Sequence, residues 1–324
     1  MASRQRSSRL RRTLLAVLVA ASVAVPVSGA ARPAAVPAPV PAELGRLRDA
    51  SPVTLEARYA ANRSGIRAAE RMADGHGDHR RAAALRTMAA PERHFLSFDG
   101  RDGGRTAEVF GDLSRAERIA VLVPGSDTNL DTYERFRAGA VALRDEMGDR
   151  GAVIAWLGYK TPATVSPDVL TPGRADDAAP QLRAFIGGLT ASLPRTVRIS
   201  LLCHSYGSVV CGRAAHGLRL ADIVLYGSPG AGVDTAGQLH TGATVWAGRG
   251  ANDWVADVPH GSLHLPFATL GFGTDPVAKE FGARRFDAGG ADHSHYLAPG
   301  STSLKNIARI ASGKATPTAG GRHA

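Results

Sequence analysis

Five residues near the middle of the chain have the pattern of a serine nucleophile. Cys203-His204-Ser205-Tyr206-Gly207 follows the apolar run Val197 to Leu202 and precedes a stretch of helical composition. A strand that turns sharply through a serine into a helix exposes the hydroxyl for attack, and the flanking residues must be small where the two backbones nearly touch. Two glycines are usual at these flanks, and here cysteine replaces the first. We therefore predict Ser205 as a nucleophile, with an ordinary turn and capping serine as the alternative.

Acyl transfer at a serine also needs N–H donors for the negative oxygen that develops during the reaction. The apolar run Val121 to Val123 ends in Pro124-Gly125-Ser126-Asp127, a turn that leaves a backbone amide free at the end of a strand. We predict that the oxyanion hole consists of the backbone N–H groups of Ser126 and of Tyr206, the residue after the nucleophile. A plain turn between a strand and a helix is the other interpretation of this segment.

The acid of a Ser-His-Asp triad should follow the nucleophile along the chain, with the histidine last. Asp253 lies in the loop just after the apolar run Ala243 to Ala247, and it is the predicted acid. Asp257 is a neighbour that could replace it. Asp234 would serve if the acid came from the preceding strand.

Two histidines follow the last apolar run, in Gly289-Gly290-Ala291-Asp292-His293-Ser294-His295-Tyr296. Residues two apart in an extended segment lie about 7 Å from each other, so only one of them can reach the serine. We predict His293 as the base because it is nearer to the strand, and we expect His295 to pack or to contact substrate. His204 is excluded as the base, since a residue adjacent to Ser205 on a strand should point to the opposite face.

The elements that would position these residues follow the pattern of a buried parallel sheet. Short continuous apolar runs alternate with helical stretches, which is typical of βα units. The expected strands are Ile119 to Val123, Ala152 to Leu157, Val197 to Leu202, Ile223 to Tyr226, Ala243 to Ala247 and Arg284 to Phe286. The expected helices are Thr128 to Met147, Ala175 to Leu193, Tyr206 to Leu218 and Thr302 to Ile310. Right-handed crossovers place the helices on both faces, which gives an α/β, mostly parallel, doubly wound sheet.

The remaining segments divide the chain into five parts. Residues 1–30 combine a basic start with an apolar run, Thr13 to Val25, that is short for a membrane span, so we predict a signal peptide cleaved after Ala30 and a secreted protein. An uncleaved anchor helix is the alternative. Residues 31–41 are a Pro/Ala-rich linker, 42–91 a helical N-terminal extension, 92–312 the catalytic domain and 313–324 a flexible tail. The histidines of Gly75-His76-Gly77-Asp78-His79 are interpreted as part of a turn between two helices, not as a metal site.

These motifs together resemble a bacterial α/β-hydrolase family, mostly of secreted or predicted proteins, that was long catalogued only as a domain of unknown function. The resemblance covers about Glu92 to Ser312. It rests on Phe98-Asp99, Gly103-Gly104-Arg105, Gly111-Asp112, Val121-Leu122-Val123-Pro124-Gly125, His204-Ser205-Tyr206-Gly207-Ser208, His293-Ser294-His295-Tyr296-Leu297 and Pro299-Gly300-Ser301. It implies the α/β-hydrolase fold, Ser205 as nucleophile and His293 as base.

Composition excludes several other classes of function. The formal net charge of +10 comes almost wholly from scattered arginines, and aromatic content is only 6%, so the basic stripe with interleaved aromatics of a nucleic-acid-binding protein is missing. The sequence has no Gly-x-Gly-x-x-Gly motif or P-loop, and we expect no cofactor and no metal. Cys203 and Cys211 are expected to be two buried thiols, because their Cα separation should exceed the roughly 7 Å limit for a disulfide.

The function predicted from these residues is a secreted serine hydrolase, an esterase or lipase-like enzyme that forms an acyl-enzyme. Its partner would be a small-molecule or lipid-like ester, with no stable membrane span after signal cleavage. We expect the loop from Trp254 to Lys279 to be a lid, in which Leu263, Leu265, Phe267, Leu270 and Phe272 form an apolar wall beside the nucleophile. A peptidase or amidase of the same fold and a non-catalytic surface protein are the alternatives.

Overall fold

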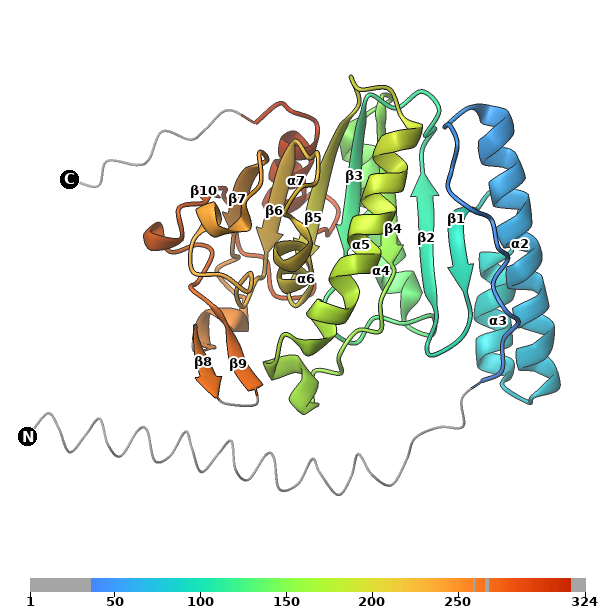
Figure 1. Cartoon of the computed structure of the whole chain (residues 1–324), viewed down its shortest axis with the longest axis horizontal. Helices are drawn as coiled ribbons and strands as arrows, with labels where there is room; N and C mark the ends of the chain where they lie inside the picture. The colour runs from blue at the N-terminus through green and yellow to red at the C-terminus, as the bar shows by residue number, and fades with distance from the viewer. Residues whose placement is uncertain (1–35, 259, 266–267, 316–324) are drawn as a thin grey trace, which may run out of the picture.

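The computed structural model describes residues 36–258, 260–265 and 268–315, so the predicted signal peptide lies outside it. Its main sheet has eight strands in the order β1-β2-β4-β3-β5-β6-β7-β10 (Figure 1). These strands are β1 (His94–Asp99), β2 (Arg105–Phe110), β3 (Arg118–Val123), β4 (Gly151–Leu157), β5 (Arg198–His204), β6 (Asp222–Tyr226), β7 (Thr244–Gly248) and β10 (Arg284–Arg285). In this sheet the neighbouring strands β4, β3, β5, β6, β7 and β10 pair in parallel, which confirms the six predicted strands. Strands β1 and β2 form an antiparallel edge beside β4.

Helices cover both faces of this sheet, as the doubly wound prediction required (Figure 1). The longer ones are α2 (Pro52–Gly75), α3 (His79–Met88), α4 (Tyr133–Met147), α5 (Gly173–Ser192), α6 (Gly207–Ala214) and α7 (Thr302–Ala311). Alternate residues of a strand belong to two hydrophobic cores, one on each face of the sheet. In β3, Ile119 and Val121 pack with α5 and α6, while Ala120 and Leu122 pack with α4 and α7. Burial on both faces explains why these strands are continuously apolar in sequence.

The N-terminal helices close the antiparallel edge of the sheet. Helix α2 starts where the Ser51 hydroxyl accepts a hydrogen bond from the N–H of Thr54, with Pro52 in its first turn, a favoured position for proline. The predicted break at Gly75 to His79 separates it from α3. Ile66 on α2 is completely buried, whereas Met72, at a similar helical spacing, is 39% exposed and lies outside the core. Val36 and Ala38, in the expected linker, pack against the core that includes α2.

Strand β2 was not predicted because a charged residue interrupts its apolar pattern. Glu108 is only 1% exposed, and its two carboxylate oxygens accept hydrogen bonds of 2.6 and 2.8 Å from the guanidinium of Arg93, which is also buried. Arg137 contacts the same carboxylate at 3.4 Å. A buried carboxylate is tolerated where its charge is paired and hydrogen-bonded. Glu108 can therefore lie inside the sheet, although a glutamate in the sequence suggests a surface position.

The prediction of two free thiols is wrong. Cys203 and Cys211 form a disulfide, and their Cα atoms are 6.4 Å apart, within the range that a disulfide can bridge. Helix α6 starts at Gly207, immediately after the turn, so its second turn still lies against the end of β5. The bond therefore ties the strand before Ser205 to the helix after it.

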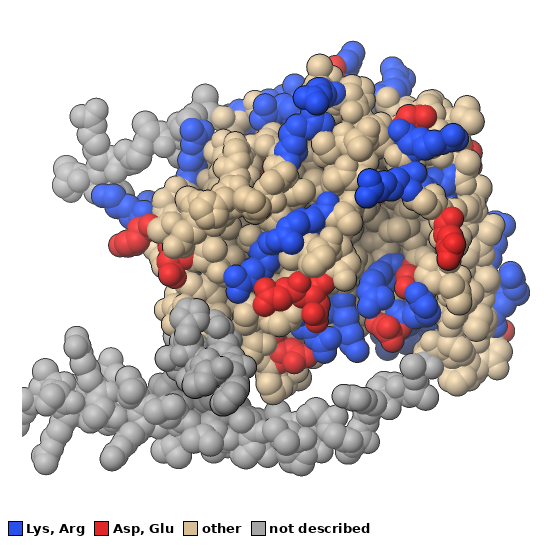
Figure 2. Space-filling view, in the orientation of Figure 1, with Lys and Arg blue, Asp and Glu red and all other residues tan. Residues whose placement is uncertain are grey.

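The segment between Trp254 and Lys279 contains the short helix η3 (Trp254–Asp257) and a separate two-stranded sheet, β8 (Gly261–Leu265) and β9 (Ala268–Gly273). Within the described residues, no helix is both long and apolar enough to span a bilayer. On the face in Figure 2, basic side chains are spread among acidic and uncharged surface and do not form one continuous stripe.

Candidate active site

The turn that carries Ser205 has the strained backbone of a nucleophile elbow. Ser205 has φ of 51°, in the left-handed region that residues with a side chain rarely adopt, and its N–H donates to the Tyr226 carbonyl oxygen at 3.0 Å. A Cβ at Gly207 would lie 2.6 Å from the carbonyl oxygens of both Val123 and Pro124. Glycine is therefore required at this flank, because the first turn of α6 touches the end of β3.

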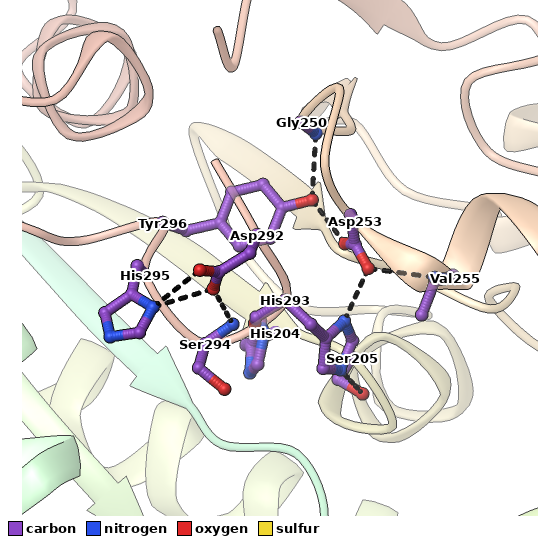
Figure 3. A network of polar contacts seen from close by, with 10 residues as sticks. All are labelled: His204, Ser205, Gly250, Asp253, Val255, Asp292, His293, Ser294, His295 and Tyr296. Atoms are coloured by element: carbon purple, nitrogen blue, oxygen red, sulfur yellow. Dashed lines mark hydrogen bonds and ion pairs between the residues drawn. The ribbon is translucent and has the colours of Figure 1, made fainter. Parts of the chain in front are cut away.

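Three predicted residues meet in one hydrogen-bonded series (Figure 3). Ser205 Oγ lies 2.9 Å from His293 Nε2, and His293 Nδ1 lies 2.9 Å from Asp253 Oδ1. Because an ionised carboxylate only accepts hydrogen bonds, Nδ1 carries the proton and Nε2 is free to accept the proton of Ser205. The three side chains come from the segments after β5, β7 and β10, which all end at the carboxyl edge of the parallel sheet, the usual place for a site in this architecture.

Asp253 is held as a buried anion. It is 3% exposed, and it accepts hydrogen bonds from the Val255 N–H at 2.9 Å and the Tyr296 hydroxyl at 2.5 Å in addition to His293. Burial acts to raise the pKa of Asp253, but the hydrogen bonds from His293, Tyr296 and Val255 outweigh it and keep this pKa below its ordinary value. Tyr296 is in turn fixed by the Gly250 N–H, which donates to its hydroxyl at 3.0 Å.

The alternative residues lie away from this series. Asp257 and Asp234 are both exposed, and neither lines the cleft around Ser205. His295 is not packed and does not line the cleft, contrary to expectation: its side chain is 69% exposed and pairs with Asp292 at 2.7 Å (Figure 3). Since His295 begins the next turn of the loop, it is directed to solvent while His293 is directed to Ser205.

His204 has a position that the sequence did not indicate. Its Nε2–H donates to the backbone carbonyl oxygen of His293 at 2.7 Å, and the two imidazole rings are 4.9 Å apart. Burial, with a smaller contribution from His293, lowers the pKa of His204 from 6.5 to about 4, so the ring is neutral at neutral pH. It cannot accept the serine proton, but it holds the backbone of the residue that can.

The Pro124-Gly125-Ser126 turn lies against Ser205, as the oxyanion-hole prediction requires. A Cβ at Gly125 would be 2.7 Å from Ser205 Cβ. Among the described residues, no acceptor is bonded to the N–H of Ser126 or of Tyr206, so both donors remain available. The buried hydroxyl of Tyr159 donates to the Pro124 carbonyl oxygen at 2.6 Å and fixes the turn from behind.

Ser205 opens into a cleft of about 430 Å³. Its walls are mainly apolar and come from η3, α4, β9 and the loops before α5 and after β10; they include Phe136, Val169, Leu170, Val255, Val258, Phe272 and Leu297. Phe272 packs edge-on against Tyr206, with ring centroids 5.6 Å apart, and so belongs to the predicted wall. Leu270 is 38% exposed and does not line the cleft, and the side chains of Leu263, Leu265 and Phe267 lie outside the described residues.

A comparison with protein families assigns the fold. The alpha/beta hydrolase family model matches residues 99–263. The chain belongs to the α/β-hydrolase family. The match includes the oxyanion turn, Ser205 and Asp253, and it confirms the resemblance and the fold class inferred from sequence.

Proteins similar to this chain are known from sequence and from structure. Uncharacterized protein Rv2079 of Mycobacterium tuberculosis is 31% identical over 254 residues, which cover 67% of this chain and 38% of the relative. The chain thus spans well under half the length of that relative. Uncharacterized protein Mb0988c of Mycobacterium bovis is 38% identical over 186 residues, 51% of this chain and 70% of the relative.

Among solved structures, esterase LipW from Mycobacterium marinum is similar with 17% identity and a TM-score of 0.42, over 84% of this chain and 96% of that one. The a/b serine hydrolase XC6422 from Xanthomonas campestris has the same identity and TM-score, over 70% of this chain and 98% of that one. These sequence identities and TM-scores are too low to carry the family assignment. The assignment rests on the match to the family model over residues 99–263.

The described residues contain no group of three or more His, Cys, Asp or Glu side chains that could hold a metal ion. At the start of α3, His79 is exposed and its Nδ1 contacts Asp74 at 3.0 Å.

Proposed function

We propose that this α/β-hydrolase is a serine hydrolase that cleaves small-molecule esters through an acyl-enzyme on Ser205. The observation that carries the proposal is the series from Ser205 through His293 to Asp253, with 2.9 Å at each step, beside two unoccupied backbone donors. A nucleophile, a base and an orienting acid in this geometry are the requirements for covalent catalysis by serine.

Each residue then has one role in the reaction. His293 Nε2 removes the proton of Ser205 Oγ as this oxygen attacks the ester carbonyl carbon, and the N–H groups of Ser126 and Tyr206 stabilise the negative oxygen. His293 returns the proton to the leaving alcohol, which departs and leaves the acyl group on Ser205. Water, deprotonated by His293, then attacks the acyl carbon, and His293 returns this proton to Ser205 Oγ as the acid is released, with Asp253 stabilising the imidazolium in both halves.

The cleft favours an ester with an apolar acyl group over a peptide. Its walls offer mainly aliphatic and aromatic side chains, among them Phe272, Val169 and Leu170. Each peptide group left there without a hydrogen-bond partner would cost about 1–3 kcal/mol, whereas an acyl chain loses nothing by leaving water.

We also propose that the protein is exported, with residues 1–30 as a cleaved signal peptide. The Cys203–Cys211 disulfide supports this, because disulfides persist mainly in oxidising compartments. Protein recovered from the culture medium should start near Ala31 by N-terminal sequencing. Recovery only in the membrane fraction, with the first residues attached, would favour the anchor instead.

The activity is tested by hydrolysis of 4-nitrophenyl esters of increasing acyl length, with 4-nitroanilides of the same acyl groups for comparison. We expect turnover of the esters, little turnover of the anilides, and a loss of at least about 10³-fold in Ser205→Ala. Ser64→Ala, which removes an exposed hydroxyl on α2, is the matched control and should keep full activity. Equal activity in Ser205→Ala would refute the proposal, and faster cleavage of anilides would assign an amidase.

A further inference from the structure

We propose that Arg135 selects esters whose leaving alcohol carries a carboxylate. This inference deepens the proposed function, since it concerns the substrate class of the Ser205 site. It starts from the charged side chains of the cleft: among the described residues that line it, Asp127 is the only acid and Arg135 is the only Arg or Lys.

The carboxylate oxygens of Asp127 already accept hydrogen bonds inside the protein. Its Oδ1 accepts a hydrogen bond from the Thr164 N–H at 3.1 Å, and its Oδ2 accepts one from the Thr164 hydroxyl. Asp127 therefore serves to hold the loop after β4 against the oxyanion turn. Both carboxylate oxygens of Asp127 are therefore engaged by neutral donors, and its negative charge remains in the cleft beside that of Arg135.

Arg135, in contrast to Asp127, has a charged group without a bonded partner among the residues that the structure describes. Its neighbour Glu134 is turned to the other side of α4, where it binds Arg93 at 2.8 Å and approaches Arg137. Within the described part of the chain, no carboxylate lies within ion-pair distance of the Arg135 guanidinium. An exposed arginine without a carboxylate partner in a mainly apolar cleft has room for an anion.

We infer from the position of Arg135 on α4 that it lies on the leaving-group side of Ser205. Gly139, one helical turn later on the same face, also lines the cleft, and a Cβ there would lie 3.0 Å from Leu297. Leu297 follows His293 by four residues in the same loop, and Ser294 between them lines the cleft as well. Since His293 hands its proton to the departing alcohol, the alcohol lies beside this wall, within the same cleft as Arg135.

The chemistry of the site favours a carboxylate over a more highly charged group. One guanidinium matches the two oxygens of a carboxylate with two parallel hydrogen bonds, and its single positive charge balances the single negative charge of that group. Arg135 also lies in the first turn of the 15-residue helix α4, whose positive end adds to the attraction for an anion.

The test compares two butyrate esters of similar size, that of 4-hydroxybenzoate and that of 4-hydroxy-N-methylbenzamide. Each kcat/KM is divided by the rate of uncatalysed hydrolysis, which corrects for leaving ability. For the wild-type protein at low salt we expect the carboxylate ester to be preferred about three- to tenfold, with the preference decreasing in 0.5 M NaCl, because exposed ion pairs are modest and screened. In Arg135→Gln the ratio should fall to about one. Arg67→Gln, an exposed arginine on α2, is the control and should keep the wild-type ratio.

Binding to Ser205→Ala separates this inference from the proposed function. The fluorescence of Trp254, which is 53% exposed and lies 4.6 Å from the His293 ring, reports occupation of the cleft. Tighter binding of the carboxylate ester, lost in the double variant with Arg135→Gln, supports the inference even if neither ester is turned over. Equal binding of the two esters, or a preference that survives Arg135→Gln, overturns it.

Discussion

The contact between Gly125 and Ser205 makes a single added methyl group a test of the site's geometry. Gly125 has an ordinary negative φ, so alanine fits its backbone. However, the new Cβ would lie 2.7 Å from Ser205 Cβ and 3.2 Å from both Ser205 Oγ and the His204 carbonyl oxygen. Carbon atoms in contact are normally about 3.5–4.0 Å apart, so the oxyanion turn and the nucleophile must separate by about 1 Å.

A displacement of this size should reduce catalysis far more than stability. Misplacing a reacting group by about 1 Å costs about 10²-fold in rate, and removing one oxyanion donor costs about 10²–10³-fold in kcat. We therefore expect Gly125→Ala to lower kcat on a 4-nitrophenyl ester by about 100-fold with little change in KM. The unfolding temperature should fall by only a few degrees, because overpacking at one position costs about 1–3 kcal/mol.

The matched control is Gly242→Ala, where a Cβ meets no atom within 4 Å and φ is not positive. Steady-state kinetics and thermal unfolding by circular dichroism are measured on both variants. A folded Gly125→Ala protein with kcat within threefold of wild type would show that the turn beside Ser205 does not supply the oxyanion donors.

Three further predictions concern the residues around the base. His293→Ala should lower kcat by about 10⁴-fold or more, while His295→Ala, which loses only an exposed contact, should stay within twofold in the same ester assay. Tyr296→Phe removes a buried hydrogen bond to Asp253, and we expect a loss of about 1–3 kcal/mol in urea unfolding and about tenfold in kcat. Because the pKa of His204 is lowered to about 4, the unfolded chain binds a proton between about pH 6.5 and 4 that the folded chain does not. Stability should therefore fall as the pH drops through this window, by up to about 3 kcal/mol, and His204→Gln should remove this part of the pH dependence while His295→Gln leaves it unchanged.

The residues that were predictable from sequence are those fixed by chain order and local pattern. Ser205 is marked by a strand, a turn and a helix in succession, and the acid and base follow from the order in which parallel strands end at one edge. His293 was preferred to His295 because it is nearer to the end of the last strand, and it does bond to Ser205, although the segment forms turns and is not the extended chain that we expected. Each of these rules uses only a local pattern or the order of residues along the chain, so it can be applied to one sequence alone.

What could not be predicted depends on contacts between distant segments. His204 was dismissed from its position on a strand, yet it bonds to a backbone oxygen 89 residues later. Tyr159 and Tyr296 carry no local signal, because a tyrosine that fixes a turn or a carboxylate resembles any core tyrosine. The strand β2 was missed because Glu108 is buried with a distant partner, and the disulfide because the distance from β5 to α6 depends on how tightly the turn closes.

The central claim, that Ser205 attacks an acyl group with His293 as its base, is tested most directly by mapping a fluorophosphonate adduct. The protein is labelled, digested and analysed by tandem mass spectrometry, alongside Ser205→Ala and His293→Ala. We expect one equivalent of phosphonate on Ser205, none in Ser205→Ala, and labelling slowed by at least about 10²-fold in His293→Ala. An adduct on another residue, or equal labelling of Ser205→Ala, would contradict the assignment of Ser205 as the nucleophile.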